Sequence, residues 1–593
     1  MAPQTPMRPE KRSVRHVLIL WLRRDGQYWG AILLFLSLAL HLAWALADGY
    51  RLLTWFHIDD AFYYFAIARN VLQGHGVTFD HLGPTNGFQP LWMLLCLAVF
   101  TLEPLGPLVP LRVLVVLVGL FHGLTGWVLY RAARKVLSSP VALALGASWT
   151  LGYAAWSTVA VGGMETSLAA LALAGLWWVA VTMHREGAYT HPRHLRRLGW
   201  AMAFLVLARL DGVFYALGFG LWWLVHAWRE AGPPLSPASW PRERLALLSR
   251  WLARVLAPGL VLVGLYLAWN VFYVGSLMPV SARVKKWWGT MGASPYGSPW
   301  GGPPLLRALK GLVDPRPKVG PWAYAMHPWT RLYETVLAPR LQGYGWFQEM
   351  GRSARLAVGY APFFLLLVGV LWATRKRWWP SVRAGVLVPW WLGALLQGGY
   401  YDAVNHLAQR FWYWYGQMMW THAFLAFWAD AVLVRPLLSA FGTARNRRWL
   451  WEGLVLLLFA VPFFGKAWPT PAPYPVERHM YLEYARWIET HTEPGAMVGL
   501  TGAGAMGYFV RGRHIVGLDG LVGTPQYVEA LKQGRMVDYW KAHGLDYVLI
   551  NKGMRLSPIY RVLEPCLQGD EWFHHDLEGW SIKLWRFVPE RCP

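Results

Sequence analysis

Two adjacent aspartates, Asp59 and Asp60, lie in the loop that follows the first long apolar segment of the chain. The residues after them have helical spacing, with Ala61, Phe65 and Ala68 on one face. A carboxylate at the start of a helix is stabilised by the helix dipole, so one acid is explained as an N-cap. A second adjacent acid is not needed for capping. Because two neighbouring carboxylates raise each other's affinity for a proton, the pair suits general-base chemistry.

The loop after the acid pair is rich in glycine and proline and carries further polar side chains. Polar groups near a membrane are costly to remove from water and usually serve a function. We therefore expect this loop to form a polar site around the acid pair. The residues concerned are Tyr63, Tyr64, Arg69, His75, Asn86 and Gln89.

The composition indicates a membrane protein. Of the 593 residues, 55% are hydrophobic and only 15% are charged, whereas soluble proteins average about 25% charged residues. Apolar runs long enough to span a membrane recur from about residue 28 to about residue 466. The formal charge of +24 comes mainly from arginines in short loops between these runs, where membrane orientation explains them, so nucleic-acid binding is excluded.

The basic loops predict a topology of about eleven transmembrane helices across 28–466, in an inner or cytoplasmic membrane. The basic segment 1–27 is expected in the cytoplasm, and loops 49–107 and 275–356 outside, so the acid pair faces outward. The apolar stretch 90–102 is too short to span and is predicted to be a juxtamembrane helix. The block 198–228 has basic loops on both sides and is predicted to form two short helices that turn at 209–212. Arg209 and Asp211 are predicted to form an ion pair that fixes this turn.

Residues 467–593 have the composition of a soluble domain, which this topology places outside the membrane. Short apolar strands near 498–500, 514–519 and 546–550 alternate with helical or glycine-rich segments, the pattern of a small α/β domain. The glycine cluster at 502–507 is predicted to be a tight strand-to-helix turn. Cys566 and Cys592 both lie in this region, and their pairing is open.

Several motifs resemble those of the GT-C glycosyltransferases, in particular a bacterial branch related to protein mannosyltransferases, lipid A aminoarabinose transferases and arabinofuranosyltransferases. The motifs are His57-Ile-Asp-Asp-Ala-Phe, Gly74-His-Gly-Val-Thr-Phe, Pro84-Thr-Asn-Gly-Phe-Gln-Pro-Leu-Trp92, Gly163-Met-Glu-Thr-Ser167, Arg209-Leu-Asp211-Gly, Gly275-Ser-Leu-Met-Pro-Val-Ser281 and Leu518-Asp-Gly-Leu521. The acid pair is the part general to the superfamily. Related families carry a lysine before paired prolines in the first loop, where this chain has Gln89-Pro90.

The resemblance implies an inverting glycosyltransferase with a GT-C-like fold. The donor is a sugar linked to polyprenyl phosphate, and the acceptor is an extracytoplasmic glycan, lipid or protein. By analogy, Asp59 is the catalytic base and Asp60 supports it. No cofactor is assigned and no residue is predicted to bind a metal, although dependence on a divalent cation is open.

A lipid phosphate leaving group needs cationic stabilisation. Arg69 lies along the first-loop helix, and Arg283, Lys285 and Lys286 follow the seventh predicted span. The latter three residues are equally explained as contacts to the headgroups of bulk lipid. Glu165 begins a span on the outer side without a cation nearby in sequence, and is predicted to bind substrate.

Two functions from other classes compete with this interpretation. Glycine-interrupted short helices at 198–228 are also found in transporters, so a transporter or flippase of a lipid-linked or polar substrate is the main alternative. Against it, no second half of the sequence matches the first. The second competing function is that of a scaffold whose C-terminal domain holds a glycan or a partner.

Overall fold

The structure is a computed structural model of the whole chain. It describes residues 27–230, 240–291, 302–313, 329, 332–404, 411–440, 448–550, 557 and 559–592. The predictions for the basic segment 1–27 and for parts of the outer loop 275–356 therefore lie largely outside the described residues.

The protein is a polytopic α-helical membrane protein. In the described ranges, eight helical segments are long and apolar enough to cross a membrane. They are α2 (Gln27–Leu46), α6 (Val109–Ala133), α9 (Thr166–Glu186), η3 (Leu210–Gly212) with α11 (Val213–Glu230), α12 (Trp240–Trp269) with η4 (Asn270–Val274), α18 (Arg352–Ala384), η6 (Phe411–Trp414) with α20 (Tyr415–Ala429), η7 (Asp430–Val434) and α21 (Arg435–Ala440), and α22 (Arg448–Ala467).

Three further predicted spans coincide with shorter helices. These are α7 (Ser139–Thr150), continued by α8 (Tyr153–Ala155) and η2 (Trp156–Ala160), then α10 (Pro192–Ala208) and α19 (Leu387–Ala403). The predicted block of two short helices is α10 and α11, which turn through η3. The stretch predicted to be too short to span is the 11-residue helix α5 (Pro90–Phe100).

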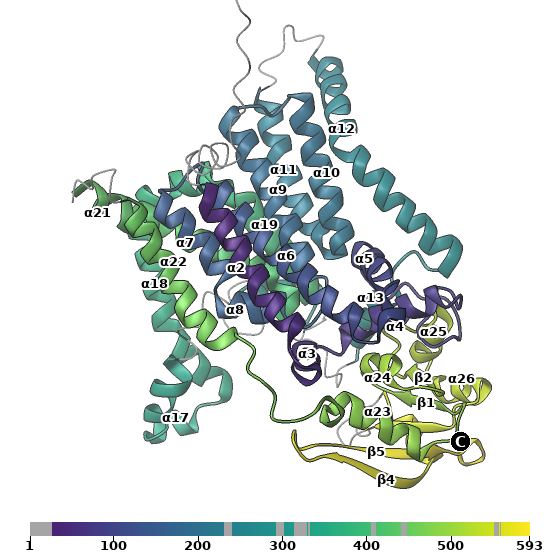
Figure 1. Cartoon of the computed structure of the whole chain (residues 1–593). Helices are drawn as coiled ribbons and strands as arrows, with labels where there is room; N and C mark the ends of the chain where they lie inside the picture. Colours follow the sequence, from purple (N-terminus) through teal and green to yellow (C-terminus); the bar gives the residue numbers. More distant parts are fainter. Residues whose placement is uncertain are drawn as a thin grey trace, which may run out of the picture.

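The long helices form a bundle in which α6 lies against α2, α7 and α9, and α10 packs between α9 and α12 (Figure 1). The α/β domain lies at one end of the bundle (Figure 1). Other short helices connect these parts. They are α3 (Gly49–Trp55), η1 (Glu103–Leu105), α14 (Pro304–Val313), η5 (Tyr333–Leu337), α16 (Ala338–Leu341), α17 (Gly345–Glu349), η9 (Val476–Arg478), η10 (Arg561–Cys566) and η11 (Pro589–Arg591).

The C-terminal α/β domain contains a five-stranded sheet with strand order β2-β1-β3-β5-β4. The first three strands are parallel and match the three predicted apolar strands, while β5 and β4 add an antiparallel hairpin that was not predicted. The predicted glycine turn is present, since β1 ends at Leu500 and helix α24 begins at Gly504 after a short turn. Its elements are α23 (Met480–His491), β1 (Met497–Leu500), α24 (Gly504–Phe509), β2 (His514–Gly517), α25 (Pro525–Lys532), α26 (Met536–His543), β3 (Tyr547–Ile550), β4 (Leu567–His575) and β5 (Trp580–Phe587).

Two short helices join the bundle to the α/β domain. Helix α4 (Asp60–Leu72) is buried on almost every side, and Phe62 contacts the rings of Tyr481 and Tyr508 from α23 and α24. Helix α13 (Val280–Trp288) has its apolar positions four residues apart, and Val280 and Val284 are fully buried in a core shared with α25. One face of α13 is therefore held by the domain, which leaves its polar face for the site described next.

Candidate active site

A cavity of about 410 Å³ lies where the bundle, α13 and the α/β domain meet. Its lining combines ionisable side chains with aromatic and aliphatic ones, as expected of a ligand site. The polar lining residues are Asp60, Tyr63, Tyr64, Gln89, Glu165, Arg209, Asp211, Ser281, Lys285, Lys286, Tyr400, Tyr401 and Tyr413, and Leu521 and Val522 come from the α/β domain.

The two aspartates of the acid pair have different surroundings. Asp60, the first residue of α4, lines the cavity. Asp59 does not, and its carboxylate instead accepts hydrogen bonds from the backbone N–H of Ala505 (2.7 Å) and of Gly504 (3.1 Å) in α24. The Asp59 side chain is thus turned toward the α/β domain, whereas Asp60 lies at the cavity.

Asp59 also differs from an ordinary N-cap. It occupies the position before α4 but makes no capping hydrogen bond to that helix, because its oxygens contact α24. Removal from water raises the pKa of the Asp59 carboxyl to about 8, aided by the charges of Asp60 and Asp519, while the two backbone N–H groups oppose the shift. Its proton affinity is therefore set mainly by the interface.

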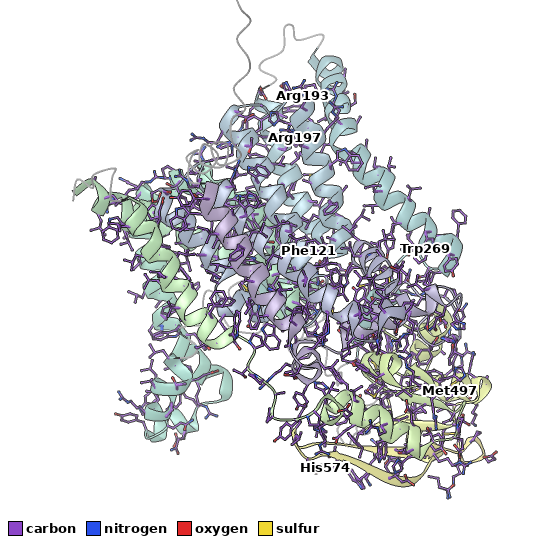
Figure 2. The ribbon with its side chains drawn as sticks, viewed as in Figure 1. Phe121, Arg193, Arg197, Trp269, Met497 and His574 are labelled. Atoms are coloured by element: carbon purple, nitrogen blue, oxygen red, sulfur yellow. A yellow bond between two sulfur atoms is a disulfide. The ribbon has the colours of Figure 1, made fainter. Side chains whose placement is uncertain are left out.

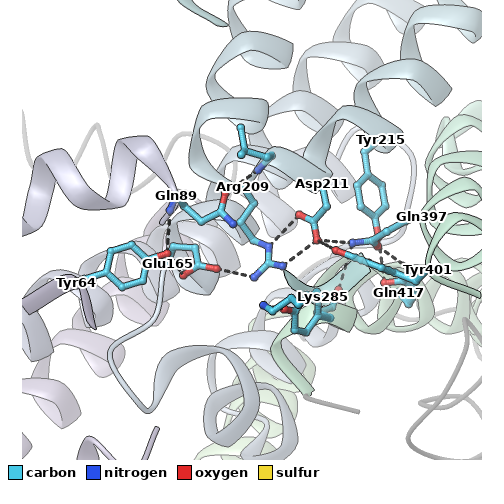
Figure 3. Close-up of polar contacts among 12 residues, drawn as sticks. Tyr64, Gln89, Glu165, Arg209, Asp211, Tyr215, Lys285, Gln397, Tyr401 and Gln417 are labelled. Carbon is cyan, nitrogen blue, oxygen red and sulfur yellow. Dashed lines mark hydrogen bonds and ion pairs between the residues drawn. The ribbon is translucent and has the colours of Figure 1, made fainter. Parts of the chain in front are cut away.

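Glu165 and the Arg209-to-Gly212 turn form one buried network (Figure 3). The Arg209 guanidinium lies 2.6 Å from a Glu165 oxygen and 2.8 Å from an Asp211 oxygen. The predicted Arg209–Asp211 ion pair is confirmed. Glu165, chosen from the sequence because it lacked a nearby cation, has that cation in Arg209, and its remaining oxygen accepts the Tyr64 hydroxyl at 3.0 Å.

Gln89 connects this network to the first loop. Its side-chain oxygen accepts the N–H of Leu210 at 2.9 Å, and its own N–H donates to the Tyr64 hydroxyl at 3.0 Å. Farther along the network, Asp211 accepts hydrogen bonds from Tyr401 and Gln397, each at 2.9 Å. The chain of bonds ties the loop after the acid pair to α19, so the polar wall of the cavity is rigidly built (Figure 3).

Helix α13 brings Lys285 and Lys286 to the cavity. Burial disfavours the Lys285 ammonium, but Tyr413 and Asp60 outweigh burial and raise the pKa of Lys285 above its ordinary value. Lys285 donates to the Tyr413 hydroxyl. Arg283 points elsewhere, because it pairs with Glu529 of α25.

The structure does not bring Arg69, His75 or Asn86 into the cavity lining. The Arg69 guanidinium lies 2.7 Å from Glu103 and donates to the Tyr508 carbonyl at 2.6 Å. The exposed His75 ring stacks on His81 at 4.4 Å. Asn86 is buried and accepts the N–H of Val280 at 2.9 Å. Arg69 thus fixes α4 to the domain, and Asn86 fixes the start of α13.

Within the described residues, no group of three or more His, Cys, Asp or Glu side chains is placed to hold a metal ion. Cys566 and Cys592, whose pairing the sequence left open, form a disulfide. Cys96 is buried and free.

Comparisons with known proteins give weak matches. Residues 474–587 match a family described as Domain of unknown function (DUF8728). No curated protein matches the chain. Among solved structures, archaeal oligosaccharyltransferase AglB from Archaeoglobus fulgidus, in complex with an inhibitory peptide and a dolichol-phosphate, is 13% identical with a TM-score of 0.44, over 95% of this chain and 74% of that one. The A. fulgidus oligosaccharyltransferase in complex with Zn and sulfate is 12% identical with a TM-score of 0.45, over the same shares. These scores are too low to establish a common fold.

Sequence reasoning missed several residues of the site. Neither Tyr401 nor Tyr413 was predicted to belong to the site, although both line the cavity. Asp519 belongs to the quoted motif Leu518-Asp-Gly-Leu521 but received no role. Its carboxylate accepts the Tyr63 hydroxyl at 3.3 Å, beside Asp60. The position of Asp519 within a motif that resembles the GT-C family is the one sequence feature that could have indicated a role for this residue.

Proposed function

We propose that the chain is a membrane glycosyltransferase of the GT-C type. It transfers a sugar from a polyprenyl-phosphate donor to a hydroxyl of an extracytoplasmic acceptor. Asp60 is the general base, Lys285 and Lys286 contact the donor phosphate, and Asp59 supports the site from the domain interface.

The observation that carries the proposal is the placement of one acid and two cations on the same cavity. Asp60, Lys285 and Lys286 line it together. In the described part of the chain, no donor lies within hydrogen-bond distance of the Asp60 carboxylate, unlike that of Asp59. Asp60 is therefore available to accept a proton from substrate.

The chemistry follows from these positions. Asp60 accepts the proton of the acceptor hydroxyl while its oxygen attacks the anomeric carbon of the donor. The new C–O bond forms as the bond to the phosphate oxygen breaks, and polyprenyl phosphate leaves with the electron pair. The two ammonium groups stabilise the charge that develops on that phosphate. Attack opposite the leaving group inverts the anomeric centre.

The cavity also has an apolar side suited to a lipid donor. Val213, Met278 and Tyr400 line it and are between 38% and 42% exposed, so an apolar edge faces outward from the protein. Val213 begins the membrane-crossing helix α11. A polyprenyl chain in the bilayer can reach the cavity from this edge while its phosphate meets α13.

We place the cavity on the extracytoplasmic side. Arg193 and Arg197 lie at the end of the bundle opposite the α/β domain residues Met497 and His574 (Figure 2). Basic loops favour the cytoplasmic side. The Cys566–Cys592 disulfide agrees with an oxidising compartment for the domain.

The proposal is tested with the full chain in lipid nanodiscs and a panel of polyprenyl-phosphate sugars, with and without EDTA. Release of polyprenyl phosphate from at least one donor, dependent on added acceptor extract, is expected. A parallel assay in proteoliposomes measures movement of the intact donor between leaflets. Movement without any cleavage across the panel contradicts the proposal and favours the transporter alternative.

A further inference from the structure

We propose that the C-terminal α/β domain is a fixed wall of the catalytic cavity, and that Asp519 is a positioning residue that locks this wall to helix α4. The part that concerns catalysis rests on the proposed function. The docking of the domain is tested separately and does not depend on it.

Asp519 joins three segments that meet at the cavity. One oxygen accepts the N–H of Gly502 (3.0 Å) and the hydroxyl of Tyr63 (3.3 Å), and the other accepts the N–H of Leu521 (3.0 Å). Tyr63 and Leu521 both line the cavity. A single buried carboxylate therefore sets the position of a residue on each side of the interface.

Tyr63 completes the connection in the reverse direction. Its hydroxyl accepts the N–H of Ala503 at 3.0 Å while it donates to Asp519. Because Tyr63 lies one helical turn after Asp60 on α4, a shift of the domain would move α4 at the proposed base. Asp59 adds a second attachment through the N–H groups of Gly504 and Ala505.

The backbones approach closely along the same interface. A Cβ added at Gly504 would lie 2.2 Å from the Asp59 carbonyl oxygen, and one at Gly87 would lie 2.3 Å from the Leu521 carbonyl oxygen. Such contacts leave no room for a larger residue on either side. The first loop and the domain are thus fitted to each other at the cavity edge.

The domain also holds the helix that carries the two lysines. Val284 of α13 is fully buried in a core shared with Leu518 and Tyr527 of the domain. A Cβ at Gly520 would lie 3.4 Å from a Val284 methyl group. The segment 518–522 therefore contacts α4, α13 and the cavity at once, which makes the domain part of the site rather than an appended module.

A cross-link tests the docking. A Cβ on Gly83 would lie 3.9 Å from the Cβ of Thr524, a separation typical of disulfides. The variant with Gly83→Cys and Thr524→Cys should cross-link rapidly on mild oxidation, and the rate should fall severalfold when Asp519→Asn is added. Little cross-linking in a folded protein, or a rate unchanged by Asp519→Asn, overturns the fixed wall whether or not any sugar donor is turned over.

Kinetics test the positioning role. The amide of an asparagine at position 519 has only one oxygen that can accept hydrogen bonds, whereas both carboxylate oxygens of Asp519 accept them. Asp519→Asn should therefore lower kcat about tenfold to a hundredfold. The Kd for the donor should change less than about threefold. Asp546→Asn is the matched control, because Asp546 accepts the N–H of Met497 at 2.8 Å in the same domain but lies off the cavity. Equal effects of the two variants on kcat overturn the positioning role.

A double-mutant cycle separates positioning from loss of stability. Tyr63→Phe removes the hydroxyl that bridges Ala503 and Asp519. If the two residues act as one unit, Tyr63→Phe combined with Asp519→Asn should lower kcat little more than the stronger single change. Additive effects overturn the proposed coupling, and the cross-linking rate of each variant reports docking without any assay of turnover.

Discussion

Arg209 and Glu165 lie 44 residues apart in the sequence, and their side chains form an ion pair of 2.6 Å with exposed fractions of only 3% and 2%. Arg209 simultaneously pairs with Asp211. One cation thus serves two carboxylates at the cavity wall. The hydroxyls of Tyr64 and Tyr401 and the amide of Gln397 donate further hydrogen bonds to those carboxylates. A fully satisfied network of this kind fixes the shape of the wall.

Loss of Glu165 should destabilise the protein, since Arg209 would keep only one of its two carboxylate partners. We expect Glu165→Gln to lower the free energy of unfolding by about 1–3 kcal/mol. This decrease is smaller than the one expected when a buried charge loses its only partner, because Arg209 still pairs with Asp211. Thermal unfolding in detergent measures this change. Glu186→Gln on the same helix is the control, because Glu186 is half exposed, and an equal shift in the two variants contradicts the network.

The stability of the domain interface should depend on pH through Asp59. Its pKa rises from 3.8 to about 8 on folding, so the folded state binds more protons than the unfolded state between these values. The free energy of unfolding contributed by this group is therefore largest at low pH and falls as the pH rises toward 8. We expect melting temperatures measured from pH 5 to pH 8 to fall less steeply in Asp59→Asn than in the unaltered protein.

Two variants test whether Asp59 causes this pH dependence of stability. Asp546→Asn should keep the original slope, because Asp546 lies near the surface of the domain. Some slope should remain in Asp59→Asn, since burial also raises the pKa of Asp519. An unchanged slope in Asp59→Asn would show that Asp59 does not titrate as proposed.

The two lysines of α13 should govern affinity for the lipid phosphate. Lys285→Gln and Lys286→Gln are each expected to weaken binding of polyprenyl phosphate by about tenfold, because each removes one charge-assisted contact. Binding is measured in nanodiscs at two salt concentrations. Lys541→Gln on α26 is the control for overall charge, and a similar loss of binding in that variant would indicate nonspecific attraction.

Local patterns in the sequence were sufficient for much of the fold. Apolar runs predicted the spans, and the apolar strands β1 to β3 were found because each is a short buried run beside turn residues. The Arg209–Asp211 pair was predicted because its partners are two residues apart. Each of these features depends on neighbours in the chain.

The remaining features depend on contacts between distant segments. Asp59 meets Ala505 across 446 residues, so the sequence offers no sign that Asp59 faces the domain while Asp60 faces the cavity. Arg69 was assigned to the donor phosphate because it is a cation near the acid pair, yet Glu103 and the Tyr508 carbonyl occupy it. The hairpin β4–β5 was overlooked. Its second strand does alternate between apolar and polar residues from Trp580 to Leu584, but its first strand begins with the polar run 568–571, which is not typical of a strand.

The difference between the two aspartates is tested most directly by donor turnover in Asp60→Asn. The base role requires a loss of at least about a hundredfold in kcat, with donor binding and melting temperature close to those of the unaltered protein. Asp59→Asn should instead lose stability and slow the cross-link between positions 83 and 524, with a smaller loss in kcat. Full turnover by a folded Asp60→Asn protein would contradict the account.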